Sequence, residues 1–513
     1  MKFYNTQEIR EWDEFTIQNE SIASFDLMER AASNAFKAII KILKSSNKIL
    51  IVCGNGNNGG DGFVMALLLI QSGYDVCVLH FDSPDVFSGD SIYHYQKLKS
   101  LYPKKVLEID VDFKGISISE YDIIIDALFG SGLNRPLDGK WLIIINFLNN
   151  HKNNLKIAID IPSGFPSEID VNQIDEYKNK YLKCQHTFTF QQLKSSFLYA
   201  ESEDATGKVE VIDIGLLDSY SNITKSDSYF LTFDEVKHYL PSRYKFEHKG
   251  SFGHGLIIGG SQGKYGALIL SAKAMMKTGS GMGTVLCTKG SEQIIPIAIP
   301  EVMSIVNSGV NFLEFQSIDY PTFDAIGIGP GMGQEASTQK LLLNVIENCH
   351  QLSLPIVIDA DGLNMIAKIG IEHILWPNKC IITPHPKEFD RLANKTFKHA
   401  KERADYAQEL AVKYQITILL KGGVSAIFHP NGQIYYQLES SVALATAGSG
   451  DTLTGIITSL LTQGLSTMQS ANIGVFIHAW AGIWCSKNIG SASTTASDIT
   501  KGIKAFYLQI ESK

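Results

Sequence analysis

The stretch KILIVCGNGNNGGDGFVMALLLIQSG, residues 48–73, decides the fold of the first half of the chain. Its six opening residues form an apolar run that is typical of a strand buried on both faces. Residues 63–73 at its other end predict a helix that stops at a glycine. A second apolar run follows at residues 74–81. Strand, helix and strand make a βαβ unit, so we expect parallel strands joined by a right-handed crossover.

The loop inside this stretch, residues 52–62, allows three interpretations. Its glycines have the G-x-G-x-x-G spacing of a dinucleotide-binding turn, and Asp82 lies near the position of a ribose-binding acid. The same glycines suit a tight turn that binds nothing. The loop also carries asparagines and Asp61, whose side-chain oxygens suit a hard cation. The glycines are Gly54, Gly56 and Gly59, and the asparagines are Asn55, Asn57 and Asn58.

Two later strands end in polar loops of the same kind. Residues 121–128 predict a strand that ends near Asp126, and residues 156–162 predict one that ends near Asp160 and Ser163. Ligands of open parallel sheets bind beyond the carboxyl ends of the strands, so these loops should converge with the first one. Each acid taken alone also suits a structural cap.

Length and composition limit the class of protein. A chain of 513 residues with 44% apolar content predicts two domains rather than one core. The net charge of −8 without a long basic run argues against a nucleic-acid or membrane surface. Seven scattered cysteines, without a C-x-x-C pair, suggest neither a disulfide framework nor a zinc site. No apolar run of 18 residues or export signal is evident, so we expect a soluble, cytoplasmic protein that acts on small molecules.

The second half restarts the strand and helix alternation at residues 255–281, where a glycine loop separates a strand from a helix. The predicted fold class is therefore α/β throughout, with two domains joined by a polar linker. Further strands are expected within residues 323–331, 354–362, 379–386 and 416–423.

Near the end of the chain, ATAGSGD at residues 445–451 precedes an apolar helical run. A glycine loop that opens a helix presents free N–H groups to an anion, and Asp451 beside it is suited to act as a base near a transferring phosphoryl group. The alternative is that Asp451 only caps the helix.

Three other motifs in this half allow both a functional and a structural interpretation. His385 lies between two prolines at a strand end, where it suits either a substrate contact or a cap. Lys421 stands beside a glycine turn that suits either a nucleotide phosphate or a change of chain direction. The sequence GIGPGMG at residues 327–333 allows close backbone approach to a ligand, or is only a tight turn.

The motifs NNGGDG, DALFGSGL and DIPSG, in this order, resemble the NAD(P)H-hydrate epimerase domain, also called the YjeF N-terminal domain. The resemblance covers roughly the first 215 residues and implies a Rossmann-like fold. It implies that a potassium ion is bound by Asn58, Asp126 and Ser163, and that Asp160 contacts the substrate and serves in catalysis. It further implies that the hydrated dinucleotide is bound by Asn57, Asn58, Gly59, Gly60, Asp61, Gly130, Ser131, Gly132, Leu133, Asn134, Arg135 and Pro136.

The motifs GIGPGMG, DADGLN, TPHPKE, KGG and AGSGD resemble the ADP/ATP-dependent NAD(P)H-hydrate dehydratase family, a branch of the ribokinase-like fold. The resemblance implies that Ala267, Gly331, His385 and Asp451 contact the hydrate. It implies a nucleotide site, with magnesium, at Lys421, Gly422, Gly423, Val424, Ser425 and Gly450. The family often has Asn-Pro-Gly before G-S-G-D, where this chain has ESSVALAT at residues 439–446.

Together the resemblances predict an epimerase domain at residues 1–215, a linker at 216–229 and a dehydratase domain at 230–513. The predicted function is repair of NADH and NADPH hydrates, with epimerisation followed by ADP- or ATP-dependent dehydration of the S form, in a homo-oligomer. The main alternative is a ribokinase-like small-molecule kinase with a regulatory nucleotide-binding first domain. A further alternative makes the first domain a binding module whose acids are only structural.

Overall fold

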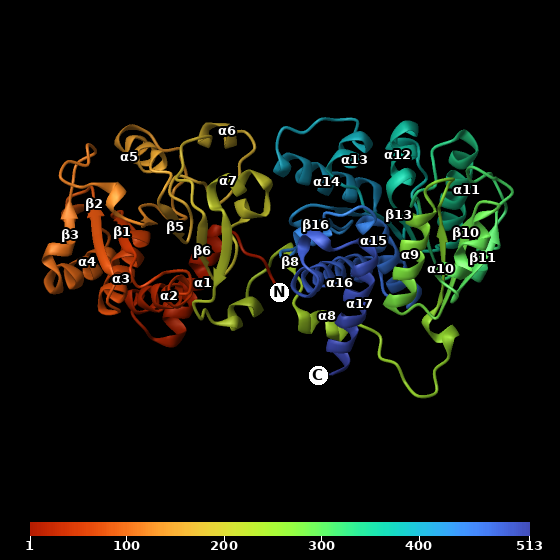
Figure 1. The fold of residues 1–513 in the computed structure, drawn as a ribbon, viewed down its shortest axis with the longest axis horizontal. Coiled ribbons are helices and arrows are strands. Elements are labelled where there is room, and N and C mark those ends of the chain that lie inside the picture. The colour runs from red at the N-terminus through yellow and green to blue at the C-terminus, as the bar shows by residue number, and fades with distance from the viewer. Residues whose placement is uncertain (513) are drawn as a thin grey trace. The chain divides into compact units, whose positions relative to one another are not determined.

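A computed structural model describes residues 1–512 and divides the chain into two compact units (Figure 1). The first unit comprises Phe3–Ser226 and His399–Lys401, and the second comprises Met1–Lys2, Asp227–Lys398 and the chain from Glu402 onward. Each unit is built around its own sheet.

The first unit holds a seven-stranded sheet in the order β3-β2-β1-β4-β5-β6-β7, with every neighbouring pair parallel. This is the Rossmann-like arrangement that was predicted. Its strands are β1 (Lys48–Cys53), β2 (Asp75–His80), β3 (Val106–Glu108), β4 (Ile123–Ala127), β5 (Leu155–Ile159), β6 (His186–Phe190) and β7 (Lys208–Ile212). Its helices are α1 (Thr6–Glu20), α2 (Ser24–Ile39), α3 (Asn57–Gln71), α4 (Gly89–Leu101), α5 (Gly139–Asn150), α6 (Ile174–Tyr177) and α7 (Glu203–Thr206).

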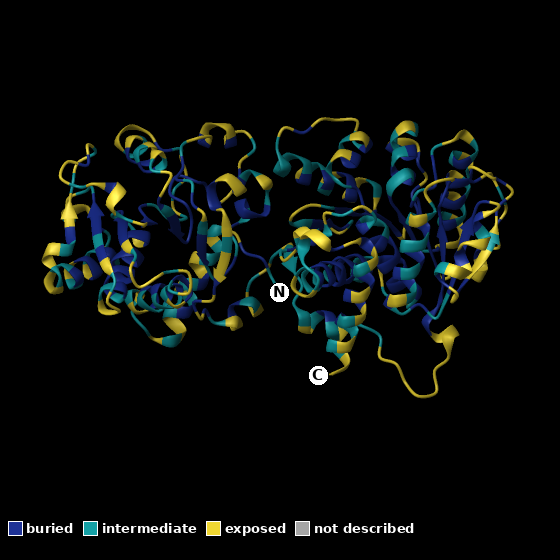
Figure 2. Cartoon of the chain, viewed as in Figure 1, coloured by how far each residue is buried: buried dark blue, intermediate teal, exposed yellow. Residues whose placement is uncertain are grey.

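The apolar strands of this sheet are buried on both faces, as Figure 2 shows. In β1, Ile49 and Ile51 pack into the core that includes α2 and α3, whereas Leu50 and Val52 pack into a second core that includes α5. Alternate side chains of a strand point to opposite faces, so a continuous apolar run requires helices on both sides. The unit is therefore a three-layer α/β sandwich.

The glycine loop after β1 is shorter than the sequence predicted. Helix α3 begins at Asn57, so the NNGGD segment forms its first turns rather than a loop. An added Cβ at Gly59 would lie 1.9 Å from the carbonyl oxygen of Gly54, and one at Gly54 would lie 1.8 Å from that of Leu128. These glycines are required because backbone approaches backbone here, which brings the start of α3 against the ends of β1 and β4.

The second unit holds a ten-stranded sheet in the order β11-β10-β9-β12-β13-β14-β15-β16-β17-β8. Neighbours from β11 to β15 are parallel, β16 pairs antiparallel with both β15 and β17, and β8 pairs parallel with β17. The strands are β8 (Ser228–Phe230), β9 (His254–Ile258), β10 (Met282–Cys287), β11 (Val302–Val306), β12 (Ala325–Ile328), β13 (Ile356–Ile358), β14 (Cys380–Ile382), β15 (Thr417–Leu420), β16 (Ser425–Phe428) and β17 (Ile434–Gln437).

The helices of the second unit are α8 (Phe233–Tyr239), α9 (Tyr265–Thr278), α10 (Ile295–Ala298), α11 (Ala336–Leu352), α12 (Ala360–Ile369), α13 (Pro386–Leu392), α14 (Ala400–Tyr414, whose first two residues belong to the first unit), α15 (Ser449–Thr462), α16 (Thr467–Asn488) and α17 (Ala496–Glu511). Helix α15 is central, because Leu453 and Ile457 pack on the sheet while Ile456 and Leu460 pack on α16 and α17. The stretch DADGLN, expected at a strand end, mostly belongs to α12.

The stretch 216–229, proposed as a linker, contributes buried Leu216 and Tyr220 to the core of the first unit, and the proposed domain bounds stay a prediction. Among residues 1–512, no helix is long and apolar enough to cross a membrane.

Helices α9 and α15 pack so closely that a methyl group between them should destabilise the second unit. At Gly455 an added Cβ would lie 2.0 Å from the backbone oxygen of Ser271. Alanine favours a helix over glycine by about 1 kcal/mol, but overpacking costs about 1–3 kcal/mol. We expect Gly455→Ala to lower the melting temperature of this unit in calorimetry. Gly266→Ala, with no atom within 4 Å of its Cβ, is the matched control. Equal melting of the two variants would contradict the packing argument.

Candidate functional site

In the first unit the sheet order reverses direction between β1 and β4. At such a switch point the chains that leave neighbouring strands diverge, which opens a crevice at the carboxyl edge of the sheet. Here the crevice is bordered by the start of α3, the loop after β4 and the loop after β5. These are the three polar segments that the sequence predicted to converge.

Asp126 and Ser163 are joined directly at this edge. Ser163 Oγ donates to Asp126 Oδ1 at 2.6 Å, and the Ser163 backbone N–H donates to Asp126 Oδ2 at 2.7 Å. Both residues are fully buried. Burial raises the pKa of Asp126 to about 6, although the hydrogen bonds from Ser163 favour the charged form. Within residues 1–512, the carboxylate is thus stabilised by hydrogen-bond donors and forms no ion pair.

Asn58 reaches the same place through the peptide groups of Phe129. Its Nδ2 donates to the Phe129 carbonyl at 2.9 Å, while the Phe129 N–H donates to Ser163 Oγ at 2.8 Å. Asn58 Oδ1 is buried without a hydrogen-bond partner in the described chain. An orphaned buried oxygen in a native fold calls for an explanation, and a bound ion is one of the usual ones. The three predicted cation ligands therefore lie together.

Asp160 lies at the end of β5 with a positive φ of 63°. Its Oδ1 is 2.6 Å from Lys194 Nζ and accepts a hydrogen bond from the Phe190 N–H at 3.0 Å. A small cavity of about 90 Å³ is lined by Asp160, Lys194 and Ser131, among others. Lys194 belongs to none of the motifs in the sequence. It follows the end of β6 within QQLKSS and is thus another residue beyond a parallel strand.

The remaining predicted residues of the first unit differ in how far they are buried. Gly59, Gly60 and Asp61 are buried in α3, whereas Asn57 is exposed. In the loop after β4, a Cβ added at Gly130 would lie 3.2 Å from the Cβ of Asn58. Asp82, considered as a ribose-binding acid, is instead paired with Lys140 at 2.5 Å. The other loop residues are half-buried or exposed: Ser131, Gly132, Leu133, Asn134, Arg135 and Pro136.

The second unit has a larger cavity, of about 560 Å³, at the carboxyl ends of β13, β14 and β15 and the start of α15. It brings together six of the predicted residues: His385, Lys421, Gly422, Ser425, Gly450 and Asp451. Gly423 and Val424 do not line this cavity, and neither do Ala267 and Gly331. The last two lie side by side elsewhere, since an added Cβ at Gly331 would be 3.1 Å from that of Ala267.

Asp451 lies in the first turn of α15, but it is not the N-cap. The N-cap is Gly448, in the left-handed region with φ 87°, so the capping interpretation of Asp451 is wrong. Burial, followed by the nearby charge of Asp359, raises the pKa of Asp451 to about 7. A carboxyl group that titrates near neutral pH is suited to accept a proton.

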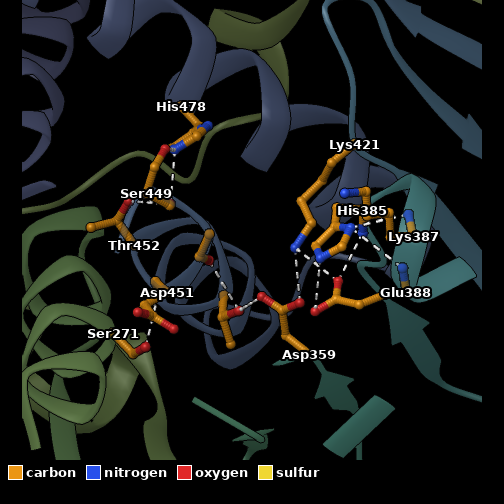
Figure 3. Close-up of polar contacts among 12 residues, drawn as sticks. Ser271, Asp359, His385, Lys387, Glu388, Lys421, Ser449, Asp451, Thr452 and His478 are labelled. Carbon is orange, nitrogen blue, oxygen red and sulfur yellow. Dashed lines mark hydrogen bonds and ion pairs between the residues drawn. The ribbon is translucent and has the colours of Figure 1, made fainter. Parts of the chain in front are cut away.

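Lys421 makes an ion pair that the sequence analysis missed. Its Nζ is 2.9 Å from Asp359 Oδ1, and Thr454 Oγ1 donates to Asp359 Oδ2 at 2.9 Å (Figure 3). Glu388 lies further away, with its Oε2 4.0 Å from Lys421 Nζ. Asp359 and Glu388 lie within DADGLN and TPHPKE, two motifs of the sequence analysis, but only contacts across the sheet distinguish them from other acids.

His385 has a structural role as the N-cap of α13. Its Nδ1 accepts from the backbone N–H groups of Lys387 at 3.1 Å and Glu388 at 3.3 Å (Figure 3). An accepting Nδ1 leaves the proton on Nε2, which lies 3.5 Å from Glu388 Oε1. Burial lowers the pKa of His385. The ring is thus a neutral N–H donor that lines the cavity.

Both halves of the chain match families of known proteins. Residues 24–196 match the family model described as YjeF-related protein N-terminus, and residues 255–505 match the model described as NAD(P)H-hydrate dehydratase. The chain is 30% identical to the bifunctional NAD(P)H-hydrate repair enzyme Nnr of Moorella thermoacetica, over 97% of this chain and 95% of that protein. The corresponding enzyme of Coxiella burnetii is 31% identical, over 97% of each chain.

The chain belongs to the family of bifunctional NAD(P)H-hydrate repair enzymes. This confirms the two resemblances on which the sequence analysis relied. Among solved structures, the ADP/ATP-dependent NAD(P)H-hydrate dehydratase of Bacillus subtilis, co-crystallised with ATP and Mg²⁺, is 26% identical with a TM-score of 0.48. It is matched over 55% of this chain and 98% of its own. Within the described residues, no group of three or more His, Cys, Asp or Glu side chains is arranged to hold a metal ion.

We expect Asp359→Asn to lower the pKa of Asp451 below about 7, because it removes a neighbouring negative charge. The pKa should stay above the usual 3.8, since burial is the larger cause of the shift. A carboxyl-carbon NMR titration, assigned with an Asp451→Asn sample, measures it. Asp319→Asn, at an exposed position of the same unit, should leave it unchanged. An unchanged or higher value in Asp359→Asn would show that the two carboxylates do not interact.

Proposed function

We propose that the first unit interconverts the R and S hydrates of NADH and NADPH, and that the second dehydrates the S hydrate at the expense of ADP or ATP. The observation that carries this proposal is a near full-length match to bifunctional repair enzymes in a chain with a site in each unit. The fusion has a chemical reason. Hydration produces both epimers, and a stereospecific dehydratase accepts one, so the other must be converted.

The residues of the first site fit a potassium ion. Asn58 Oδ1 is buried without a partner in the described chain, and Asp126 supplies a buried carboxylate beside Ser163 Oγ. Oxygen atoms of mixed amide, carboxylate and hydroxyl type are ligands for a hard cation. When bound, the ion would neutralise the Asp126 charge and fix the loops after β4 and β5. Asn57 to Asp61, Gly130 to Pro136 and Asp160 are the proposed hydrate contacts.

The second site is suited to phosphoryl transfer. Gly450 lies in the first turn of α15, whose free N–H groups attract phosphate, and Lys421 Nζ would lie 3.4 Å from a Cβ added at Gly450. Nucleotide binding is assigned to Lys421–Ser425 and Gly450, with magnesium as the counterion of the phosphates. Ala267, Gly331, His385 and Asp451 are assigned to the hydrate.

Asp451 is the proposed base of this reaction. It takes the proton of the hydrate hydroxyl as that oxygen attacks the terminal phosphoryl group. The rest of the catalysis of phosphoryl transfer is positioning and charge neutralisation. Phosphate then leaves more easily than hydroxide would: the carbon–oxygen bond breaks, the adjacent ring carbon loses a proton, and the double bond of the reduced nicotinamide is restored. A cytoplasmic location and a homo-oligomeric state are also proposed.

One assay separates this function from the kinase alternative. The protein is incubated with mixed hydrate epimers and ADP or ATP, and the absorbance of reduced nicotinamide and the release of free phosphate are followed. Repair restores the absorbance of reduced nicotinamide and releases free phosphate for both epimers. A small-molecule kinase gives a stable phosphorylated product and does not restore that absorbance. The same assay with each nucleotide and each hydrate determines the donor and substrate preferences.

Asp126→Ala should slow epimerisation and abolish its dependence on potassium, because it removes the only carboxylate of the proposed cation site. Dehydration of purified S hydrate should stay near the wild-type rate. The measurement is epimer interconversion in potassium and in sodium chloride, together with the melting temperature in each salt. A comparable loss of dehydration would show that the two sites are not independent.

Asp451→Asn should reduce nucleotide-dependent dehydration by about 10²–10⁴-fold, because asparagine cannot accept a proton at neutral pH. Melting temperature, nucleotide affinity and epimerisation should stay near wild type. Absorbance recovery from S hydrate measures the loss, and a thermal melt is the control for folding. Near-normal turnover of this variant would overturn the assignment of Asp451 as the base.

A further inference from the structure

Four ionisable side chains gather in the first unit, apart from the proposed cation ligands. Asp13 comes from α1, Asp61 from α3, Asp160 from the end of β5 and Lys194 from the loop after β6. Lys194 Nζ is 2.6 Å from Asp160 Oδ1, and their side chains are 7% and 12% exposed. Asp61 is 8% exposed. Segments distant in sequence thus bring three carboxyl groups and one ammonium group together.

The charges of this group do not balance. Burying a charge without a partner is costly, so the one ammonium group of this set cannot keep all three carboxyl groups ionised, of which Asp61 and Asp160 are buried and Asp13 is half-buried. Asp13 Oδ1 is buried without a hydrogen-bond partner in the described chain. Burial raises the pKa of Asp13 to about 7, with Asp160 and Glu14 raising it and Lys194 and Arg10 lowering it. Burial and the neighbouring carboxylates of Asp160 and Asp13 raise the pKa of Asp61 as well. The group therefore holds an exchangeable proton near neutral pH.

The proton is next to a cavity. Asp13, Asp160 and Lys194 line the space of about 90 Å³ that Ser131 also borders. Ligand pockets for whole small molecules usually measure about 300–1,000 Å³, so this one admits only the reacting end of a dinucleotide. Ser131 and Asp160 are both proposed hydrate contacts, which places the other two side chains at the same end of the substrate.

We propose that Asp13 is the second acid–base residue of the epimerase site, paired with Asp160, and that Lys194 is the positioning residue that holds the Asp160 carboxylate in place through their ion pair. This inference rests on the proposed epimerase function of the first unit. It extends that function to residues that neither the sequence motifs nor the family matches singled out.

The chemistry of the hydrate requires two such groups. Water adds to the enamine double bond of the reduced ring so that the hydroxyl is on C6, the carbon bonded to N1. The Asp160 carboxylate accepts the hydroxyl proton as the C6–N1 bond breaks, the electron pair of that bond goes to N1, and Asp13 gives N1 a proton. The product is a ring-opened aldehyde. After rotation about C5–C6, N1 attacks the other face of the aldehyde and both protons return, so no atoms or electrons are lost.

The test is the rate of R to S interconversion, above the uncatalysed rate, followed by NMR between pH 5 and 9. Wild-type activity should fall as the pH rises above about 7, because Asp13 then loses the proton that it donates. Asp13→Asn should lower the rate by about 10²–10⁴-fold and remove this pH dependence. Asp13→Glu should restore part of the rate, and Lys194→Arg should retain more activity than Lys194→Met.

Glu14→Gln is the matched control, since it removes a charge of the same sign from the next position of α1, where the side chain is exposed. At pH 6, below the pKa of about 7 of Asp13, it should leave the rate within about twofold, because the Glu14 side chain lies on the surface. A thermal melt of each variant reports on the folding of the first unit, and dehydration of S hydrate reports on the second. If wild type interconverts the epimers and Asp13→Asn does so within threefold with the same pH profile, this inference is overturned. If wild type does not interconvert them, the proposed epimerase function itself fails.

Discussion

The carboxyl ends of parallel strands meet at one edge of each sheet, and the proposed catalytic groups of both units depend on this constraint. In the first unit it places the residues after β1, β4 and β5 side by side, so Asn58, Asp126 and Ser163 share one place. In the second unit the ends of β13 and β15 bring Asp359 to Lys421. Because the backbone hydrogen bonds of the sheet set these distances, the side chains need little further ordering.

Buried carboxyl groups are the chemical consequence of that geometry. Asp126 is fully buried, whereas Asp451 is half-buried and lines its cavity. Their pKa values are raised to about 6 and about 7, and in each case burial is the largest cause. Their surroundings differ, however. Asp126 accepts two hydrogen bonds from Ser163, and the amide oxygen of Asn58 in the same site has no partner in the described chain. Asp451, in contrast, lies near other acids and one lysine. The first environment suits a cation, and the second suits proton transfer.

Backbone contacts at glycine explain why the helices stand where the sites need them. Gly59 lets α3 start against Gly54, and Gly455 lets α15 pack on the backbone of α9. The first contact brings Asn58 to the edge of the sheet, and the second holds the helix that carries Asp451 in the centre of its unit. Glycines that look like ligand-binding loops in the sequence are thus also needed for helix packing.

The sequence by itself determined the α/β class, the approximate place of the strands and the polar loops that follow them, because apolar runs and glycine turns are local signals. Its motifs also located Asp126, Ser163 and Asp451. It misjudged the start of α3 and the helix that contains DADGLN, since element boundaries depend on packing.

Only the tertiary structure decided which acids act together. Asp13 and Asp359 are ordinary acids in the sequence, and each acquires a role only through partners about 60 to 180 residues away, as the Lys421–Asp359 pair shows. The structure also identified His385 as a helix cap and excluded that role for Asp451. Burial and charge balance are sums over neighbours from distant segments, and these neighbours are not defined until the chain is folded.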